Sequence, residues 1–185
     1  GPAILAVDES ANCGLEVPEL SKKTQAALKK ISPPEGAVYN PVDILPPADG
    51  TTYAKAAGLM LQDANIDSLI VIVGPPLMLD TLEIAKAICE EVKNTEKTVM
   101  LVMMSQDDVI PKLKEILPVH PPIYRFPENA ARAISKMAAY KKWNAKGATA
   151  VVMNPHTGEI LALVNRPTFD PNQYSKALPD NRRNR

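Results

Sequence analysis

Few side chains in this sequence could perform chemistry, and they are scattered along the chain. The two histidines are His120, in a proline-rich stretch, and His156, in the stretch NPHTG. A nucleophilic histidine needs a partner that orients its ring and donors that face the phosphoryl oxygens. Neither stretch supplies these groups, so we interpret both histidines as exposed turn residues.

The two cysteines, Cys13 and Cys89, are too far apart in sequence to suggest a metal site. Cys89 falls on the apolar face of an expected helix, so we interpret it as a small core residue. No apolar run approaches the ~20 residues that a membrane helix needs, and no signal peptide is visible. These features predict a reduced, cytoplasmic setting without a metal or a membrane. The C-terminal NRRNR could touch nucleic acid, but a solvated tail is the favoured interpretation.

Asp8 and Glu9 form an acidic pair directly after the apolar run 3–7. If this run is a strand, the pair lies at its carboxyl end, where two carboxylates could hold Mg²⁺. The arrangement resembles a two-component receiver domain, which also needs an acceptor aspartate at the end of its third strand. Val71 and Ile72 occupy that place, and neither can be phosphorylated. Receiver chemistry is therefore disfavoured, and the resemblance is one of fold.

The elements that must position these residues follow from apolar periodicity. Short apolar runs alternate with segments of helical spacing, which is typical of an α/β domain with a parallel sheet. The expected strands are 3–7, 42–45, 68–73, 98–104 and 123–126; the expected helices are 21–31, capped by Ser21, 52–64, one capped by Asp80, one capped by Ser105 and one opened by Pro127. The predicted fold is a flavodoxin-like, parallel five-stranded sheet sandwiched by helices, with strand order 2-1-3-4-5 and 68–73 as a central strand. Ligands of such sheets bind at the carboxyl ends of the strands, where Gly74 and Ser105 are expected.

The pattern changes at Gly147 from alternating strands and helices to two strands, 148–153 and 159–164. They predict a C-terminal β-hairpin extension, followed by an irregular tail rich in proline, asparagine and arginine. We therefore expect one domain at 1–146 and a second segment at 147–185. An exposed edge strand of the hairpin would be available for a homodimer.

Residues 1–141 resemble the last flavodoxin-like domain of the α portion of NDP-forming acyl-CoA synthetases, the acetate–CoA ligases related to succinyl-CoA synthetase. The resemblance is carried by GPAILAVDESANCGLEVPELS at 1–21, NPVDIL at 40–45 and IYRFPENAARAISKMAAYKKW at 123–143. It implies CoA and ATP or ADP with Mg²⁺ as cofactors of the complete enzyme, in which a histidine carries phosphate between two sites. The segment with this histidine belongs to a preceding domain, so the chain alone is expected to bind no cofactor and to be inactive.

The resemblance also implies candidates for ligand contacts. The relatives present a glycine pair at a helix start, a natural seat for phosphate. Gly74 keeps one position of the pair, but Pro75 and Pro76 follow it and contribute no N–H donors. Two interpretations of this loop therefore remain: it keeps a residual contact with an anion, or it is only a tight turn between a strand and a helix.

Asn40 and Asp43 belong to a second family motif and are further candidates for facing a ligand. Tyr39 and Pro46 stand where the family usually has glycines, and both stiffen the segment. An Asx-type turn with a purely structural role is the favoured alternative.

The remainder of the chain resembles the start of the transpeptidase domain of class B penicillin-binding proteins. Three sequence motifs carry this resemblance: GATAVVMNPHTGEILALV, then FDPN and RNR. The nucleophile motif Ser-x-x-Lys and the Ser-x-Asn and Lys-Thr-Gly elements are all missing from the sequence. Acyl transfer and β-lactam binding are therefore disfavoured, and the chain looks like a chimera of two families.

Two functions of different classes remain open. In the first, the chain is a non-catalytic domain of an acyl-CoA synthetase that docks on other domains or subunits. In the second, it is a stand-alone binding or structural module, or a fusion product, without enzymatic activity. An exposed apolar patch where partner domains would pack favours the first, and a polar surface there favours the second.

Overall fold

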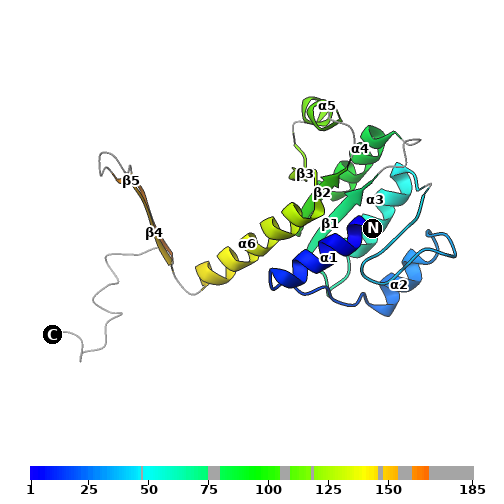
Figure 1. The fold of residues 1–185 in the computed structure, drawn as a ribbon, viewed down its shortest axis with the longest axis horizontal. Helices are drawn as coiled ribbons and strands as arrows, with labels where there is room; N and C mark the ends of the chain where they lie inside the picture. Colours follow the sequence, from blue (N-terminus) through cyan, green and yellow to red (C-terminus); the bar gives the residue numbers. More distant parts are fainter. Residues whose placement is uncertain are drawn as a thin grey trace. The chain divides into compact units, whose positions relative to one another are not determined.

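The computed structural model describes residues 1–46, 48–74, 80–104, 109–117, 119–145, 148–153 and 160–166 (Figure 1). The chain divides into two compact units, Gly1–Ser135 and Lys136–Arg185, and each is described by itself. In chain order the elements are α1 (Pro2–Asn12), α2 (Lys22–Leu28), α3 (Gly50–Leu61), β1 (Ser68–Val73), α4 (Thr81–Val92), β2 (Thr98–Met103), α5 (Val109–Ile116), β3 (Ile123–Tyr124), α6 (Pro127–Ala145), β4 (Ala148–Met153) and β5 (Ile160–Arg166).

The first unit is built on a parallel sheet whose described strands follow the order β1-β2-β3. The register of β1 on β2 runs from Ser68 opposite Thr98 to Val73 opposite Met103. Every residue of β2 from Val99 onward is buried, as expected for a strand that is covered on both faces. The α/β class and the parallel sheet predicted from the sequence are therefore confirmed.

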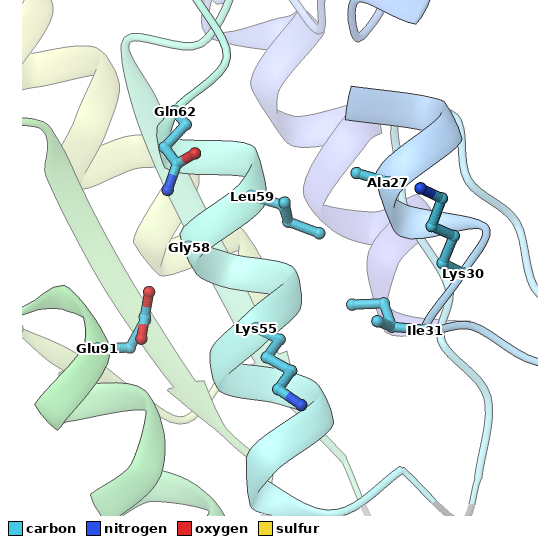
Figure 2. A pocket seen from close by; sticks show the side chains of 8 residues that line it. All are labelled: Ala27, Lys30, Ile31, Lys55, Gly58, Leu59, Gln62 and Glu91. Atoms are coloured by element: carbon cyan, nitrogen blue, oxygen red, sulfur yellow. The ribbon is translucent and has the colours of Figure 1, made fainter. Parts of the chain in front are cut away.

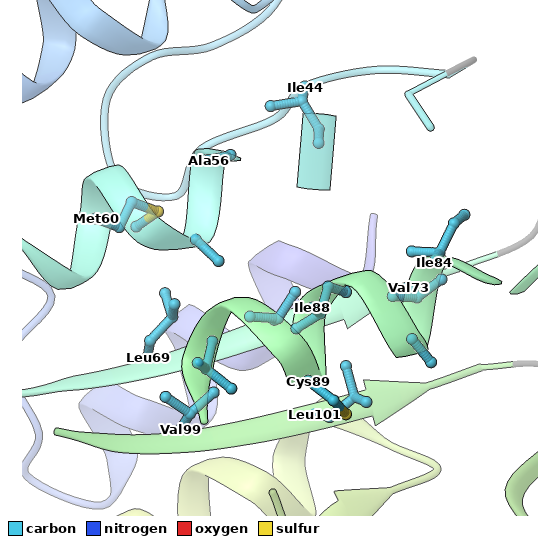
Figure 3. Close-up of a cluster of buried hydrophobic side chains, with 14 of the residues drawn as sticks. Ile44, Ala56, Met60, Leu69, Val73, Ile84, Ile88, Cys89, Val99 and Leu101 are labelled. Atoms are coloured by element: carbon cyan, nitrogen blue, oxygen red, sulfur yellow. The ribbon is translucent and has the colours of Figure 1, made fainter. Parts of the chain in front are cut away.

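Helices cover both faces of this sheet. On one face α3 and α4 pack on the strands, and Figure 3 shows the apolar side chains that meet there. On the other face Ala130 and Ile134 of α6 pack against Met100 and Val102 of β2. The largest fully buried side chains are Leu28, Val73, Ile88, Met100, Leu101, Val102, Met103, Leu113 and Pro127. Burial of each large aliphatic side chain stabilises the fold by about 1.5–3 kcal/mol relative to exposure.

Side-chain caps determine where three helices begin. Ser21 caps α2 and Asp80 caps α4, and each side chain accepts a backbone N–H from the first turn, as predicted. The cap of α3 was not predicted from the sequence. Asp49 accepts the N–H of Thr52 at 2.8 Å, so this helix begins at Gly50, two residues before the expected start at 52.

The expected strand at 3–7 is wrong, because these residues lie in α1. Pro2 occupies the start of the helix, where the missing N–H costs nothing. Ala6 and Ser10, four residues apart and thus on one face, are the buried residues of α1. A short apolar run does not distinguish a strand from a partly buried helix, and here the helix is formed.

The expected strand at 42–45 is also wrong. Asp43 forms only an isolated antiparallel bridge with Ala37. The described residues therefore form a parallel sheet of three strands rather than five, and the order 2-1-3-4-5 is not observed. β1, which was expected to be central, lies at an edge of the described sheet. The last predicted strand, 123–126, shortens to Ile123–Tyr124 because α6 begins at Pro127.

The second unit contains an antiparallel pair of strands. β4 and β5 pair from Ala148 opposite Arg166 to Met153 opposite Ile160. The segment between them, 154–159, and the tail after 166 lie outside the described residues, so the predicted turn and tail stay predictions. Among the described residues, no helix is long and apolar enough to cross a membrane.

Candidate functional site

The carboxyl ends of β1 and β2 lie side by side, since the N–H of Met104 donates to the carbonyl oxygen of Val73 at 2.9 Å. Gly74 follows β1 directly and is half-buried. A Cβ placed on Gly74 would meet nothing within 4 Å, so close packing does not require a glycine there. Pro75, Pro76 and Ser105 lie outside the described residues. The predicted anion contact at this loop therefore stays a prediction.

Asn40 and Asp43 shape the loop that contains them. The side-chain amide of Asn40 donates to the carbonyl oxygen of Pro18 at 3.1 Å. The carboxylate of Asp43 accepts the N–H of Leu45 at 3.0 Å, which is the Asx-type turn weighed above as the structural alternative. Leu45 has a positive φ of 54°, an uncommon conformation that this turn helps to hold. The described contacts of both side chains are thus structural, and a ligand-facing role for them is untested.

Asp8 and Glu9 do not follow a strand, because both lie in α1. Asp8 is exposed, whereas the carboxylate of Glu9 accepts the Nε–H of Arg132 in α6 at 2.5 Å. This hydrogen bond with Arg132 lowers the pKa of Glu9 from its usual value. Cys13 lies beside it and directs its thiol to Glu9 at 3.5 Å. In the described residues no hydrogen bond joins either acid to Asn40, Asp43 or Gly74, so a shared site is not assembled by such bonds.

Among the described residues, Asp63 is a carboxylate with several hydrogen bonds that the sequence reasoning missed. It is 3% exposed and accepts the N–H of Ser21 at 2.8 Å and the N–H of Asn65 at 3.0 Å. Hydrogen bonds, with that from the Thr24 hydroxyl foremost, hold the pKa of Asp63 well below its usual range. The Lys97 ammonium donates to the backbone carbonyl of Asp63 at 2.7 Å. Asp63 thus links the start of α2 to the end of α3. Its neighbours in sequence could not reveal this contact, because the partner Ser21 is 42 residues away.

A shallow groove runs between the end of α2 and the outer side of α3 (Figure 2). Its volume is about 340 Å³, and it is lined by Ala27, Lys30, Ile31, Lys55, Gly58, Leu59, Gln62 and Glu91. Apolar side chains such as Ile31 and Leu59 form part of its wall, and Lys30, Lys55 and Glu91 supply charges of both signs. Its residues come from α2, α3, α4 and the turns that follow α2 and α3, so no single sequence motif predicts this groove.

The described residues were also considered as metal ligands and as a nucleophilic histidine site. No group of three or more His, Cys, Asp or Glu side chains in those ranges could hold a metal ion. His120 directs Nδ1 to the carbonyl oxygen of Pro121 at 2.7 Å, so this nitrogen carries the proton and donates. His156 lies outside the described residues.

Comparison with known proteins decides the family. The model of the Ligase-CoA domain matches residues 1–152, which is most of the chain. The chain belongs to the Ligase-CoA domain family. Its similarity extends to the α subunit of the ADP-forming acetate–CoA ligase II of Pyrococcus furiosus, with 38% identity over 138 residues. That match covers 72% of this chain and 30% of the relative. The chain thus spans less than a third of the length of this ligase relative.

Solved structures share the fold of the matched part of this chain. A protein of Pyrococcus horikoshii OT3 superposes with a TM-score of 0.70 at 39% identity, over 77% of this chain and 34% of that one. The dinucleotide-forming acetyl-coenzyme A synthetase 1 of Ca. Korarchaeum cryptofilum, in complex with phosphate and ADP, superposes with a TM-score of 0.69. Its 23% identity, over 77% of this chain and 31% of that one, shows the fold alone.

The end of the Ligase-CoA chain matches a second family. The penicillin-binding protein transpeptidase model matches residues 148–185. The probable peptidoglycan D,D-transpeptidase PenA of Neisseria flavescens is 52% identical over 52 residues, which are 28% of this chain and 12% of that protein. Both resemblances found in the sequence are thus confirmed, and the two model matches overlap only at residues 148–152.

Proposed function

We propose that residues 1–146 are a non-catalytic domain of an NDP-forming acyl-CoA synthetase, and that residues 147–185 are a penicillin-binding-protein fragment without chemistry of its own. One observation carries the proposal: 138 residues of the chain align at 38% identity with an acetate–CoA ligase α subunit and account for 30% of it. In such an enzyme the chemistry converts an acyl-CoA, NDP and phosphate into the acid, CoA and NTP. The other parts of the enzyme would supply the phosphohistidine, CoA and nucleotide sites.

The described side chains support a structural role for this domain. The carboxylates of Asp43, Asp63 and Glu9 each accept a hydrogen bond from this same chain. His120 is hydrogen-bonded to a backbone carbonyl and has no orienting carboxylate among its described contacts. A phosphoryl carrier needs such an orienting partner and donors for the phosphoryl oxygens. Catalysis is therefore assigned to other domains or subunits.

Exposed apolar side chains on and near α1 support the proposal that this domain docks on other domains. Ile4 and Leu5 are 52% and 47% exposed, and Val17, shortly after the helix, is 37% exposed. Apolar side chains left in water on one helix are typical of a surface that a partner covers. Cys13 and Cys89 are free thiols, which suits the reduced, cytoplasmic setting that we propose for the enzyme.

Exchange of the domain into a relative tests this function. The matched segment of the Pyrococcus furiosus ligase II α subunit is replaced by residues 1–146, and acetyl-CoA formation from acetate, CoA and ATP is measured. We expect activity in the chimera and none above the blank in the isolated chain. A chimera with Leu101→Asp, which places a charge at a fully buried position, is the inactive control.

Two results would contradict the proposal. One is turnover by the isolated, purified chain, because the chain would then hold its own catalytic groups. The other is a chimera that folds, by circular dichroism, and assembles yet lacks activity, which would favour the stand-alone module. For the C-terminal segment we expect no band after labelling with fluorescent penicillin and denaturation, with a complete PenA as the positive control.

A further inference from the structure

The α2–α3 groove, which is the shallow groove of Figure 2, follows the outer side of α3. Lys55, Gly58, Leu59 and Gln62 are spaced by three and four positions, so they form one stripe along about two turns of this helix. The centre of the stripe is small or apolar, and both of its ends are polar. Figure 2 shows Leu59 directed toward α2, and Glu91 of α4 on the other side of α3. A shallow groove along a helix has the form that accepts a helix of a partner.

Gly58, in the floor of the groove, is not held as a glycine by close contact with a neighbouring backbone. The three heavy atoms nearest to a Cβ at this position belong to the exposed side chain of Glu91, which can move away. At Gly50, in contrast, a Cβ would lie 3.3 Å from the Cα of Ile84 in α4. A glycine within a helix destabilises it relative to alanine. Gly58 therefore fits a place where another backbone approaches α3 from outside.

The charge around the groove is positive on the α2 side. Residues 20–34 contain four lysines and no aspartate or glutamate, although the first unit has more acidic than basic side chains. Lys30 and Lys55 line the groove and are exposed, and within the described ranges neither forms a salt bridge. Glu91 supplies a negative charge on the α4 side. The groove thus complements a partner that places its acidic residues over α2.

Beside these lysines the floor of the groove is apolar. Ala27, Ile31 and Leu59 are half-buried, and the last two pack on the main core cluster. The core therefore holds this floor in place before any partner arrives. Burial of apolar surface on such a floor supplies binding free energy, and the charges on the rim select the partner.

We propose that the α2–α3 groove is the docking surface for an acidic amphipathic helix of a partner protein. The apolar face of that helix covers Ile31 and Leu59, and its backbone comes closest to α3 at Gly58. Its acidic side chains pair with Lys30 and Lys55. The proposal rests on the described surface of the first unit and is independent of ligase chemistry.

A peptide titration of the full chain tests this proposal. The probe is a stapled helical peptide with leucines at helical spacing along one face and glutamates on both flanks of that face. The control peptide has lysines in place of the glutamates. Backbone amide shifts of the isotope-labelled chain, measured by NMR, report binding. We expect the glutamate peptide to shift the amides of 27–31 and 55–62, and to bind about tenfold or more tightly than the lysine peptide, because like charges across an interface repel.

Variants of the chain assign the binding to the groove. Lys30→Glu combined with Lys55→Glu should invert the preference, so that the lysine peptide binds more tightly. Lys22→Glu combined with Lys23→Glu, at the other end of α2, is the matched control and should leave the preference unchanged. Gly58→Ala should weaken binding of the glutamate peptide by about fivefold or more without lowering the Tm, because its methyl group occupies the point of closest approach.

The proposal is overturned if the glutamate peptide leaves the amides of the groove unshifted, or if both peptides bind every variant equally tightly. Sodium acetate is added in a separate titration at the same concentration of carboxylate. Equal shifts with acetate would make the groove a contact for simple anions and would refute a docking helix. Shifts of these amides that depend on the concentration of the chain, without any peptide, would make a second copy the occupant and would likewise refute it.

Discussion

Replacement of Asp63 by asparagine is the sharpest test of how the first unit is held together. Each carboxylate oxygen accepts one backbone N–H, that of Ser21 at 2.8 Å and that of Asn65 at 3.0 Å. An amide has one oxygen, so Asp63→Asn leaves one of these N–H groups facing an NH₂ donor. A hydrogen bond to a charged group contributes about 1.5–3 kcal/mol, and a buried donor without a partner costs about 1–3 kcal/mol. Since part of this cost relaxes, we expect a loss of about 2–4 kcal/mol.

Urea unfolding followed by far-UV circular dichroism measures this loss. With a slope of about 1–3 kcal/mol per molar urea, the midpoint should fall by about 1–2 M. Asp67→Asn is the matched control, because it makes the same chemical change at a nearby exposed residue. A loss below about 0.5 kcal/mol, the range of ordinary surface substitutions, would refute the assignment of Asp63 as the tie between α2 and α3.

The pH dependence of stability gives an independent check on Asp63. Its pKa is lowered in the folded chain, so the unfolded chain binds more protons as the pH falls below the unfolded pKa of about 3.9. The stabilisation is therefore complete above that pH and is lost progressively as the pH decreases through it toward the lower folded value. We expect the difference in unfolding free energy between the wild type and Asp63→Asn to shrink below about pH 4. A difference that stays constant into acid would contradict the reasoning.

Two pairs of substitutions test the packing of the helices. Ile88→Ala should cost about 2–5 kcal/mol by thermal or urea unfolding, because Ile88 is fully buried, whereas Ile116→Ala, at a half-exposed site, should cost far less. Gly58→Ala should be neutral or stabilise α3 by up to about 1 kcal/mol, since the atoms nearest to its new methyl group belong to the flexible, exposed side chain of Glu91. Gly50→Ala should destabilise, because its methyl group meets the backbone of α4 at 3.3 Å; the reverse order of the two glycine variants would contradict this packing.

Apolar periodicity and N-cap residues correctly predicted the elements with a clear buried face, such as β1 and α4. The run 68–73 contains no polar residue after Ser68, and it forms β1. Asp80 followed by apolar residues at helical spacing predicted α4, and the structure confirms the cap and the buried face. These elements carry their own local signals, because spacing of apolar residues decides which face can be buried.

The candidate site was predicted less well, because it depends on contacts between distant segments. Asp8 and Glu9 were expected at a strand end, yet Glu9 instead pairs with Arg132, 123 residues away. Asp43 was weighed between a ligand contact and a turn, and its described hydrogen bond forms the turn. The buried role of Asp63 left no local signal, since its partner Ser21 lies at the start of α2, 42 residues away in sequence.

The sequence by itself determined the family, the α/β class and the division of the chain into segments that resemble two families. This was possible because sequence motifs and the spacing of apolar residues are local properties. Only the tertiary structure decided that 3–7 is helical and that 42–45 is not a strand. An apolar run such as Ala3–Val7 can bury side chains as a strand or as a helix, and contacts between α1 and α6 select the helix. A strand, in contrast, exists only where a neighbour satisfies its backbone, and in the described residues the segment around Asp43 has a single bridge.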